Sequence, residues 1–391
     1  MTAPACFNGI KEGAWKERTM QTRVLGNSGF EVSAVGYGCM GLSHAHGYAM
    51  EQADAVRVVR KAVEAGYTYF DTSGMYTGVT RAGNDANNEL VVGEALEPVR
   101  DQVTIATKFG VKIGAGHAFV YDSSETAIRE TVETSLRQLR TDHLDILYQA
   151  RRDERVSPEE LAGVVGDLIK EGKVLAWGIS EVTDPDYLRR AHAVTPVAVI
   201  QNKLNMANRD TEKLFPVLEE LGIAATTYTP LMKGFLTAPA DIKHLMREGD
   251  DFRRFIPQYS EKGVAEAAPL YALLEEYSQR HECTWTQLCL AWILNKRPYL
   301  VPIPGTTNPA RMRENLAAAD IILTPEEMAD IDARLDEMHP ERFGQQSRHQ
   351  QKQRRLRGLP WSRRCLHVMI GYAVISQTIS ALIPDRARRW R

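Results

Sequence analysis

The chain has 391 residues, of which 43% are hydrophobic and 25% are charged. This composition can bury a large globular core and excludes an intrinsically disordered chain. The formal net charge of −2 gives no electrostatic reason for the main body to bind nucleic acid or an acidic membrane.

The five cysteines are scattered, with no C-x-x-C pair and no histidine at zinc-binding spacing. We therefore expect free thiols, a reducing compartment and a cytoplasmic location, and we expect no metal site. Residues 1–20 contain Lys11, Lys16 and Arg18 but no apolar block of secretory length. This pattern predicts a flexible N-terminal extension and not a signal peptide.

Short runs rich in β-branched or aromatic residues recur along the main body, and each of them predicts a strand. The predicted strands span residues 32–38, 67–71, 103–108, 143–149, 174–180, 197–202, 223–229 and 299–304. Amphipathic segments lie between them. A strand followed by a helix, eight times over, predicts an α/β fold in which a parallel sheet closes into a (β/α)8 TIM barrel.

Three of the amphipathic segments carry clear start or stop signals for a helix. Residues 51–66 have an apolar stripe and end on Gly66. The stripe consists of Ala55, Val58, Val59, Ala62 and Val63. Residues 123–139 begin with serine and an acidic first turn, and residues 157–172 begin with Ser-Pro and end on glycine.

A doubly wound open sheet is the competing fold, and residues 36–41 (GYGCMG) do spell its G-x-G-x-x-G fingerprint. In a dinucleotide-binding unit of that fold, the helix opens directly from the glycines. Here the next predicted helix begins only about ten residues later. The barrel is therefore the better prediction.

In a barrel of this kind, functional groups gather at the carboxyl ends of the strands. The second predicted strand ends on Asp71, Tyr76 follows after a short turn, and the third strand ends on Lys108. An ammonium next to a phenol stabilises the phenolate and lowers its pKa, and a carboxylate can hold the ammonium in place. The three residues together predict a proton-donating site, although each alone would suit an ordinary surface position.

Seven segments of the chain resemble the aldo-keto reductases, in the order of that family. They are FDTSGMY (70–76), NNELVVGEAL (87–96), ATKFG (106–110), LRQLRTDHLDILYQ (136–149), WGISE (177–181), YTPLMKGFL (228–236) and VPIPGTTNPARMRENLAAA (301–319). The resemblance covers roughly residues 21–338. It implies a (β/α)8 barrel that binds a nicotinamide cofactor without a Rossmann fold and reduces an aldehyde or ketone by hydride transfer.

The resemblance implies that Tyr76 is the proton donor and that Lys108 and Asp71 tune it. The family's fourth catalytic residue is a histidine at the end of the fourth strand, where this chain has Ala150. Losing one hydrogen-bond donor to the developing oxyanion costs on the order of 10²–10³ in rate, so we expect a weakened reductase. Arg151 or Gln149 could substitute, but alternation along a strand points Gln149 away from the site, and Arg151 is expected to be a solvated charge.

The resemblance also assigns cofactor contacts. Ser180 and Gln201 would bind the nicotinamide carboxamide, with Tyr228 stacked on the ring, while Glu181 stands where many members have asparagine. Near the adenosine end, the expected contacts are Gly305, Thr306, Arg311, Glu314 and Asn315. Arg311 would donate two hydrogen bonds to the 2′-phosphate, which favours NADPH over NADH. Asn308 stands where many members have a lysine.

The chain from residue 339 to 391 departs from the family pattern. Residues 345–364 hold seven Lys or Arg and no acid, and the apolar run 366–383 is interrupted by polar residues. A basic segment next to an apolar run suits reversible attachment to an anionic membrane. The run is shorter than the about 20 residues that a spanning helix needs, which favours a loosely ordered tail.

Two functions are therefore compatible with the sequence. The first is an NADPH-dependent reductase of a small carbonyl compound; the second is a cofactor-binding barrel with weak or lost catalysis that acts as a redox-sensing or regulatory protein. The substrate would be selected by loops such as 43–49, 78–86 and 237–262, which vary freely on this scaffold. The sequence leaves the substrate and the oligomeric state open.

Overall fold

The computed structural model describes residues 20–113, 119–237, 247–249 and 251–343. The predicted N-terminal extension, apart from Met20, and the predicted tail from residue 344 onward lie outside these residues. The proposed boundaries at 20/21 and 338/339 therefore stay predictions.

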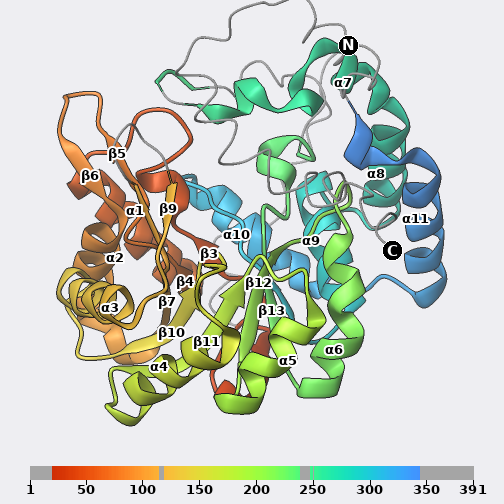
Figure 1. The fold of residues 1–391 in the computed structure, drawn as a ribbon. Helices are drawn as coiled ribbons and strands as arrows, with labels where there is room; N and C mark the ends of the chain where they lie inside the picture. The colour runs from red at the N-terminus through yellow and green to blue at the C-terminus, as the bar shows by residue number, and fades with distance from the viewer. Residues whose placement is uncertain (1–19, 114–118, 238–246, 250, 344–391) are drawn as a thin grey trace, which may run out of the picture.

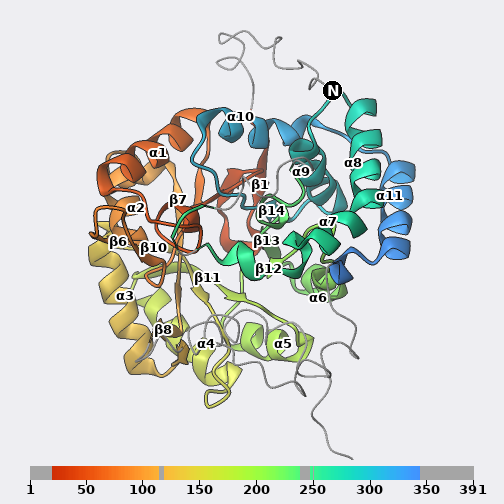
Figure 2. The same cartoon turned by 90° about the horizontal axis from the view of Figure 1, so that it is seen from above.

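Eight parallel strands form one curled sheet at the centre of the protein (Figure 2). They are β3 (Tyr37–Gly38), β4 (Tyr69–Asp71), β7 (Thr104–Phe109), β10 (Leu144–Gln149), β11 (Val174–Ser180), β12 (Val199–Lys203), β13 (Ala224–Tyr228) and β14 (Leu300–Pro302). The N–H groups of Gly36 and Gly38 donate to the carbonyl oxygens of Pro302 and Pro304 at 2.9 and 3.3 Å. These bonds join the two edges of the sheet, which confirms the predicted TIM barrel.

Helices surround the sheet as an outer ring (Figure 2). They are α1 (Gln52–Ala65), α2 (Asn88–Leu96), α3 (Glu125–Leu139), α4 (Pro158–Lys170), α5 (Pro185–Val194), α6 (Phe215–Leu221), α7 (Glu261–Glu266), α8 (Ala268–Arg280), α9 (Trp285–Lys296), α10 (Pro309–Ala317) and α11 (Pro325–Met338). Within the described ranges, none of them combines the length and the apolar character needed to cross a bilayer.

The predicted helix signals act as expected. Gly66 ends α1 in the left-handed conformation, with φ of 108°. Ser124 and Ser157 cap α3 and α4, each accepting a hydrogen bond from a backbone N–H of the first turn. Local sequence therefore sets where these helices begin and end.

The predicted strand 32–38 is wrong as a single element. Residues Glu31–Ser33 form β2, which pairs with β1 (Thr22–Val24) in an antiparallel hairpin, and the barrel strand β3 starts only at Tyr37. The chain bends between them because Ser33 and Thr68 bind each other through side chain and backbone: Ser33 N–H donates to Thr68 Oγ1 at 2.7 Å, and Thr68 N–H donates to Ser33 Oγ at 3.1 Å.

The β1–β2 hairpin closes the amino-terminal end of the barrel. Leu25 and Val32, both fully buried, belong to the cluster of apolar side chains that fills the barrel interior. Two further hairpins, β5–β6 (Thr77–Val79 and Asp85–Asn87) and β8–β9 (Val111–Ile113 and Phe119–Tyr121), follow barrel strands on the opposite side. Figure 1 shows β5–β6 projecting beside α1 and α2.

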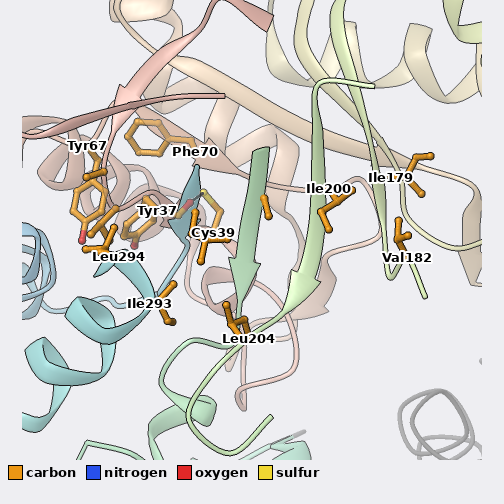
Figure 3. Packing of buried hydrophobic residues seen from close by; sticks show 14 of the residues in the cluster. Tyr37, Cys39, Tyr67, Phe70, Ile179, Val182, Ile200, Leu204, Ile293 and Leu294 are labelled. Atoms are coloured by element: carbon orange, nitrogen blue, oxygen red, sulfur yellow. Dashed lines mark hydrogen bonds between the residues drawn. The ribbon is translucent and has the colours of Figure 1, made fainter. Parts of the chain in front are cut away.

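A second, larger apolar cluster lies between the sheet and the helices. Figure 3 shows part of it, where Tyr37 packs against Tyr67 and Phe70 with ring centroids 5.5 and 5.8 Å apart. Edge-to-face and tilted contacts of this kind are favourable aromatic geometries. The first barrel strand is thereby held against its neighbours by side chains as well as by the few hydrogen bonds that its two residues can make.

Two glycines of the G-x-G-x-x-G segment, Gly36 and Gly38, serve barrel closure. A Cβ atom on Gly38 would lie 2.7 Å from the carbonyl oxygen of Ile303, so only glycine lets the first and last strands approach this closely. The segment continues into a short turn, and α1 opens only at Gln52. The doubly wound open sheet is therefore excluded.

Packing of α2 against α3 gives a test of the fold. A Cβ atom on Gly93 would overlap the carbonyl oxygen of Gln138 and lie 2.7 Å from the Leu139 Cα, whereas one on Gly163, also inside a helix, would meet open space. We expect Gly93→Ala to lower the free energy of unfolding by about 1–3 kcal/mol through overpacking. Gly163→Ala should raise it by roughly 0.5–1 kcal/mol through helix propensity. Urea unfolding of both variants checks this, and equal effects would contradict it.

Candidate active site

The predicted catalytic residues meet at the carboxyl end of two neighbouring strands. Asp71 is the last residue of β4 and Lys108 the penultimate residue of β7, and the two strands pair in parallel. Tyr76 lies at the end of the turn that follows β4. The structure therefore brings Asp71, Tyr76 and Lys108 together as the sequence predicted.

Asp71 and Lys108 form a buried ion pair, with side chains only 4% and 5% exposed. Lys108 Nζ donates to both carboxylate oxygens of Asp71, at 2.8 and 2.9 Å, and to the carbonyl oxygen of Thr72 at 2.8 Å. Burial by itself lowers the pKa of Lys108, but Asp71 and Tyr76 outweigh it and raise that pKa above the ordinary value. Lys108 is therefore a fixed positive charge at neutral pH.

Tyr76 lies against this charge: Lys108 Nζ is 5.0 Å from the centre of the phenol ring. Burial is the largest influence on its pKa and raises it, while Lys108 lowers it, and the net pKa lies above the ordinary value of 10. The expectation of a lowered pKa was wrong, because desolvation of the phenolate exceeds the effect of the ammonium. Tyr76 is thus a neutral phenol that holds a proton.

The turn that carries Tyr76 is clamped by a fully buried asparagine. Asn88 donates from its side chain to Cys39 O and Ser43 Oγ at 3.0 and 2.7 Å, and it accepts from Thr72 Oγ1 at 2.7 Å. The Tyr76 carbonyl oxygen accepts from Asn88 N–H at 3.1 Å and from Ser43 Oγ at 2.7 Å. Sequence reasoning missed this clamp, whose other members lie 12–49 positions from Asn88 in the sequence.

A polar chain continues from Asp71 into the barrel interior. Gln201 Nε2 donates to Asp71 Oδ2 at 2.7 Å and approaches Thr226 Oγ1 at 3.4 Å. Tyr148 shares hydrogen bonds of 3.1 Å with Thr226 and with Tyr69. All five side chains are buried, so each hydrogen bond orients its neighbour and the carboxylate at the top of the chain.

The end of β10 carries no polar side chain toward the site. Ala150 is buried and offers no polar side chain. Gln149 points away from the site, accepting from Tyr187 Oη at 3.0 Å and reaching Ser123 Oγ at 3.5 Å. The prediction that Arg151 is a solvated charge was wrong: its Nη1 donates to Ala150 O at 2.6 Å, and its Nη2 lies 3.4 Å from Glu181 Oε1.

Three of the predicted cofactor residues lie on consecutive strand ends. Ser180, Gln201 and Tyr228 end or nearly end β11, β12 and β13, and Ser180 Oγ donates to the Gln201 carbonyl oxygen at 3.0 Å. The Tyr228 hydroxyl donates to Glu181, which adopts the left-handed conformation with φ of 59°. Glu181 thus connects Tyr228 with Arg151.

The loops above these strand ends supply two residues that sequence reasoning missed. The His44 ring stacks on Tyr76 with centroids 5.9 Å apart, and its Nδ1 lies 2.8 Å from the Thr77 carbonyl oxygen. Lys233 Nζ lies 3.4 Å from the centre of the Phe252 ring. Burial, followed by the charges of Lys203 and Arg253, lowers the pKa of Lys233 to about 7. His44 belongs to residues 43–49, which were predicted only as a variable substrate loop. Lys233 belongs to residues 228–236, which entered only as a segment that resembles the family.

The second group of predicted cofactor residues lies after β14, at the start of α10. Gly305 and Arg311 are exposed and Thr306 is half-buried, and Asn308 caps the helix by accepting from Ala310 N–H at 2.8 Å. Glu314 accepts from Thr284 Oγ1 at 2.6 Å, and Asn315 is buried with no partner for its Oδ1. Among the described residues, Arg311 makes no ion pair, so its guanidinium and the N–H groups at the start of α10 fit an anionic group.

The buried pair gives a prediction about stability. Lys108→Met leaves the Asp71 carboxylate buried without its cation and should lower the free energy of unfolding by about 3–5 kcal/mol. Adding Asp71→Asn should cost less than the sum of the two single changes, since neither charge then remains unpaired. Lys170→Met, which breaks the exposed pair with Asp167, is the control and should have almost no effect. Additive losses in a denaturant series would contradict the pairing.

Comparison with known proteins agrees with this geometry. The model of the Aldo/keto reductase family matches residues 34–336. A probable aldo-keto reductase 1 from Glycine max is 34% identical over 309 residues, covering 78% of this chain and 86% of that protein.

Solved structures give the same fold. A glycerol dehydrogenase from Gluconobacter oxydans superposes with a TM-score of 0.71 at 24% identity, over 82% of this chain and 96% of that chain. An aldo-keto reductase from Bacillus halodurans, in its holo form, gives a TM-score of 0.63 at 25% identity over the same shares. The chain belongs to the aldo/keto reductase family and is an oxidoreductase.

Proposed function

We propose that this protein reduces an aldehyde or ketone to an alcohol with NADPH and that Tyr76 is the proton donor. The family generally binds a nicotinamide cofactor, and when bound that cofactor supplies the hydride to the carbonyl carbon. The carbonyl π electrons move to the oxygen, which takes the Tyr76 proton, and solvent returns a proton to Tyr76. The observation that carries the proposal is a neutral, half-buried phenol whose ring centre lies 5.0 Å from the ammonium of a buried ion pair.

In this proposal the side chains divide the work between two ends of the cofactor. Ser180 and Gln201 would hold the carboxamide and Tyr228 would stack on the nicotinamide ring, which leaves one face of the ring toward the substrate. Gly305, Thr306, Arg311, Glu314 and Asn315 would hold the adenosine end. Gln201 already donates to Asp71, so binding the carboxamide there would connect the cofactor to the ion pair.

A second function is favoured by one observation, the absence of a polar side chain at Ala150. A barrel that binds the cofactor but turns over slowly would suit a redox-sensing or regulatory protein. Single-turnover oxidation of bound NADPH by a panel of aldehydes, ketones and quinones separates the two functions. A regulatory barrel would bind the cofactor and leave it reduced with every compound.

Replacing the phenol tests the proton donor. Tyr76→Phe should lower kcat by about 10²–10⁴-fold, the usual contribution of a general acid, at saturating cofactor and with cofactor affinity nearly unchanged. Tyr121→Phe, in the exposed β8–β9 hairpin, is the matched control and should keep the wild-type rate. Wild-type turnover in the Tyr76 variant would mean that another group supplies the proton.

Arg311 tests the preference for NADPH. Arg311→Ala should weaken NADPH binding roughly 10-fold or more, because hydrogen bonds to a charged group contribute about 1.5–3 kcal/mol, and NADH binding should change little. Arg313→Ala, exposed on the same helix, is the control. Titration of each cofactor against intrinsic fluorescence gives the dissociation constants. Equal values for NADPH and NADH, unchanged in Arg311→Ala, would contradict the assignment.

A further inference from the structure

The end of β10 places a guanidinium next to the position where the family has its imidazole. Tyr148 is the register partner of Lys108, and Gln149 that of Ile179 on β11. Continuing this register sets Ala150 beside Ser180 and Arg151 beside Glu181, directly beyond the level of the ion pair. Because the side chain of Ala150 is small, the side chain of Arg151 can occupy the space beside it.

Arg151 is held in place from two sides. Its Nη1 donates to Ala150 O at 2.6 Å, which folds the side chain back over the strand end, and its Nη2 faces Glu181 Oε1 at 3.4 Å. Glu181 is itself fixed by the hydroxyl of Tyr228. The Arg151 side chain is 28% exposed, so its charge is only partly screened by water.

Arg151 also acts on the proton donor. Burial has the largest effect on the pKa of Tyr76 and raises it, Lys108 lowers it and Asp71 raises it; the positive charge of Arg151 adds a smaller lowering. A charge that reaches the phenol also reaches an oxygen bound to that phenol. Arg151 is therefore in electrostatic range of the atom on which negative charge develops.

Two other side chains compete for this role, and their contacts disfavour them. Gln149 points away, toward Ser123 and Tyr187. His44 stacks on Tyr76, but its Nδ1 faces a carbonyl oxygen, which can only accept. That contact puts the proton on Nδ1, so Nε2 of the neutral ring is an acceptor and not a donor. A guanidinium has five N–H donors and stays charged at every physiological pH.

We propose that Arg151 replaces the missing imidazole: its guanidinium donates a hydrogen bond to the carbonyl oxygen of the substrate, and Glu181 positions it. This inference rests on the proposed function. Arg151 keeps its protons throughout, so the hydride and Tyr76 steps balance as before. A fixed donor aimed at the developing oxyanion lowers the barrier more than it strengthens substrate binding.

The test compares Arg151→Met with Arg152→Met. Arg152 is the next residue but lies over the Tyr187 ring and near Glu154, away from the site. With saturating NADPH and an aldehyde that the wild type reduces, Arg151→Met should lower kcat by about 10–10³-fold and change KM much less. Arg151→Lys should retain part of the rate, because lysine keeps the positive charge but lacks the planar, paired N–H donors of the guanidinium. Arg152→Met should keep the wild-type kcat.

The pH profile of the reverse reaction gives a readout that a structural role would not move. In alcohol oxidation Tyr76 accepts the proton as phenolate, so the rate rises with pH through its pKa. Removing the Arg151 charge raises this pKa and should move the rising limb to higher pH, while Lys108, Asp71 and the stacked His44 stay in place. Arg152→Met should leave the limb where it is.

The outcomes separate this inference from the proposed function. Melting temperatures identify folded variants; if Arg151→Met does not fold, Arg151→Gln, whose amide can still donate to Ala150 O, takes its place with the same expected loss. A folded Arg151 variant that keeps the wild-type kcat, or in which only KM changes, overturns the role of Arg151. The proposed function stands in that case if Tyr76→Phe is inactive. A wild type that reduces no carbonyl compound overturns both.

Discussion

The buried pair of Asp71 and Lys108 is the interaction on which the site depends. Moving two charges out of water is costly, and the cost is repaid only where every partner is in place. Here the ammonium has three acceptor atoms, and the carboxylate receives a third hydrogen bond from Gln201. The register of β4 against β7, the turn that carries Tyr76 and the polar chain below Asp71 are all organised around this pair.

Hydrogen bonds connect the same pair with the turn that carries Tyr76. Thr72 contributes its carbonyl oxygen to Lys108 and its hydroxyl to Asn88, which also holds the Tyr76 carbonyl. The charge, the turn and the first residue of α2 are therefore one connected hydrogen-bonded unit. Displacing any member leaves a buried polar group unpaired, which costs about 1–3 kcal/mol for each such group.

The sequence predicted those parts of the molecule that local signals determine. Helix ends at Gly66, Ser124 and Ser157 follow from capping, which acts within one turn. Seven of the eight strands lie within two residues of the predicted bounds because burial on both faces makes them continuous apolar runs. The strand 32–38 failed because its bend depends on Thr68, 35 residues away.

At the site, the sequence located Asp71, Tyr76 and Lys108, since each lies at or just beyond a strand end. The sequence predicted a lowered pKa for Tyr76, whereas burial raises that pKa above its ordinary value. Burial depends on the assembled fold and cannot be read from the spacing of residues. Sequence reasoning also missed the clamp by Asn88 and the contacts of Arg151. The clamp and the contact of Arg151 with Glu181 join residues from different strands and loops, and no local pattern marks them.

The hairpin β1–β2 has a consequence for how molecules reach this site. Leu25 and Val32 close the amino-terminal end of the barrel, and side chains fill its interior, whereas Asp71 and Lys108 lie at the opposite ends of the strands. A small molecule can therefore approach Asp71 and Lys108 from the carboxyl side of the sheet but not through the amino-terminal end of the barrel.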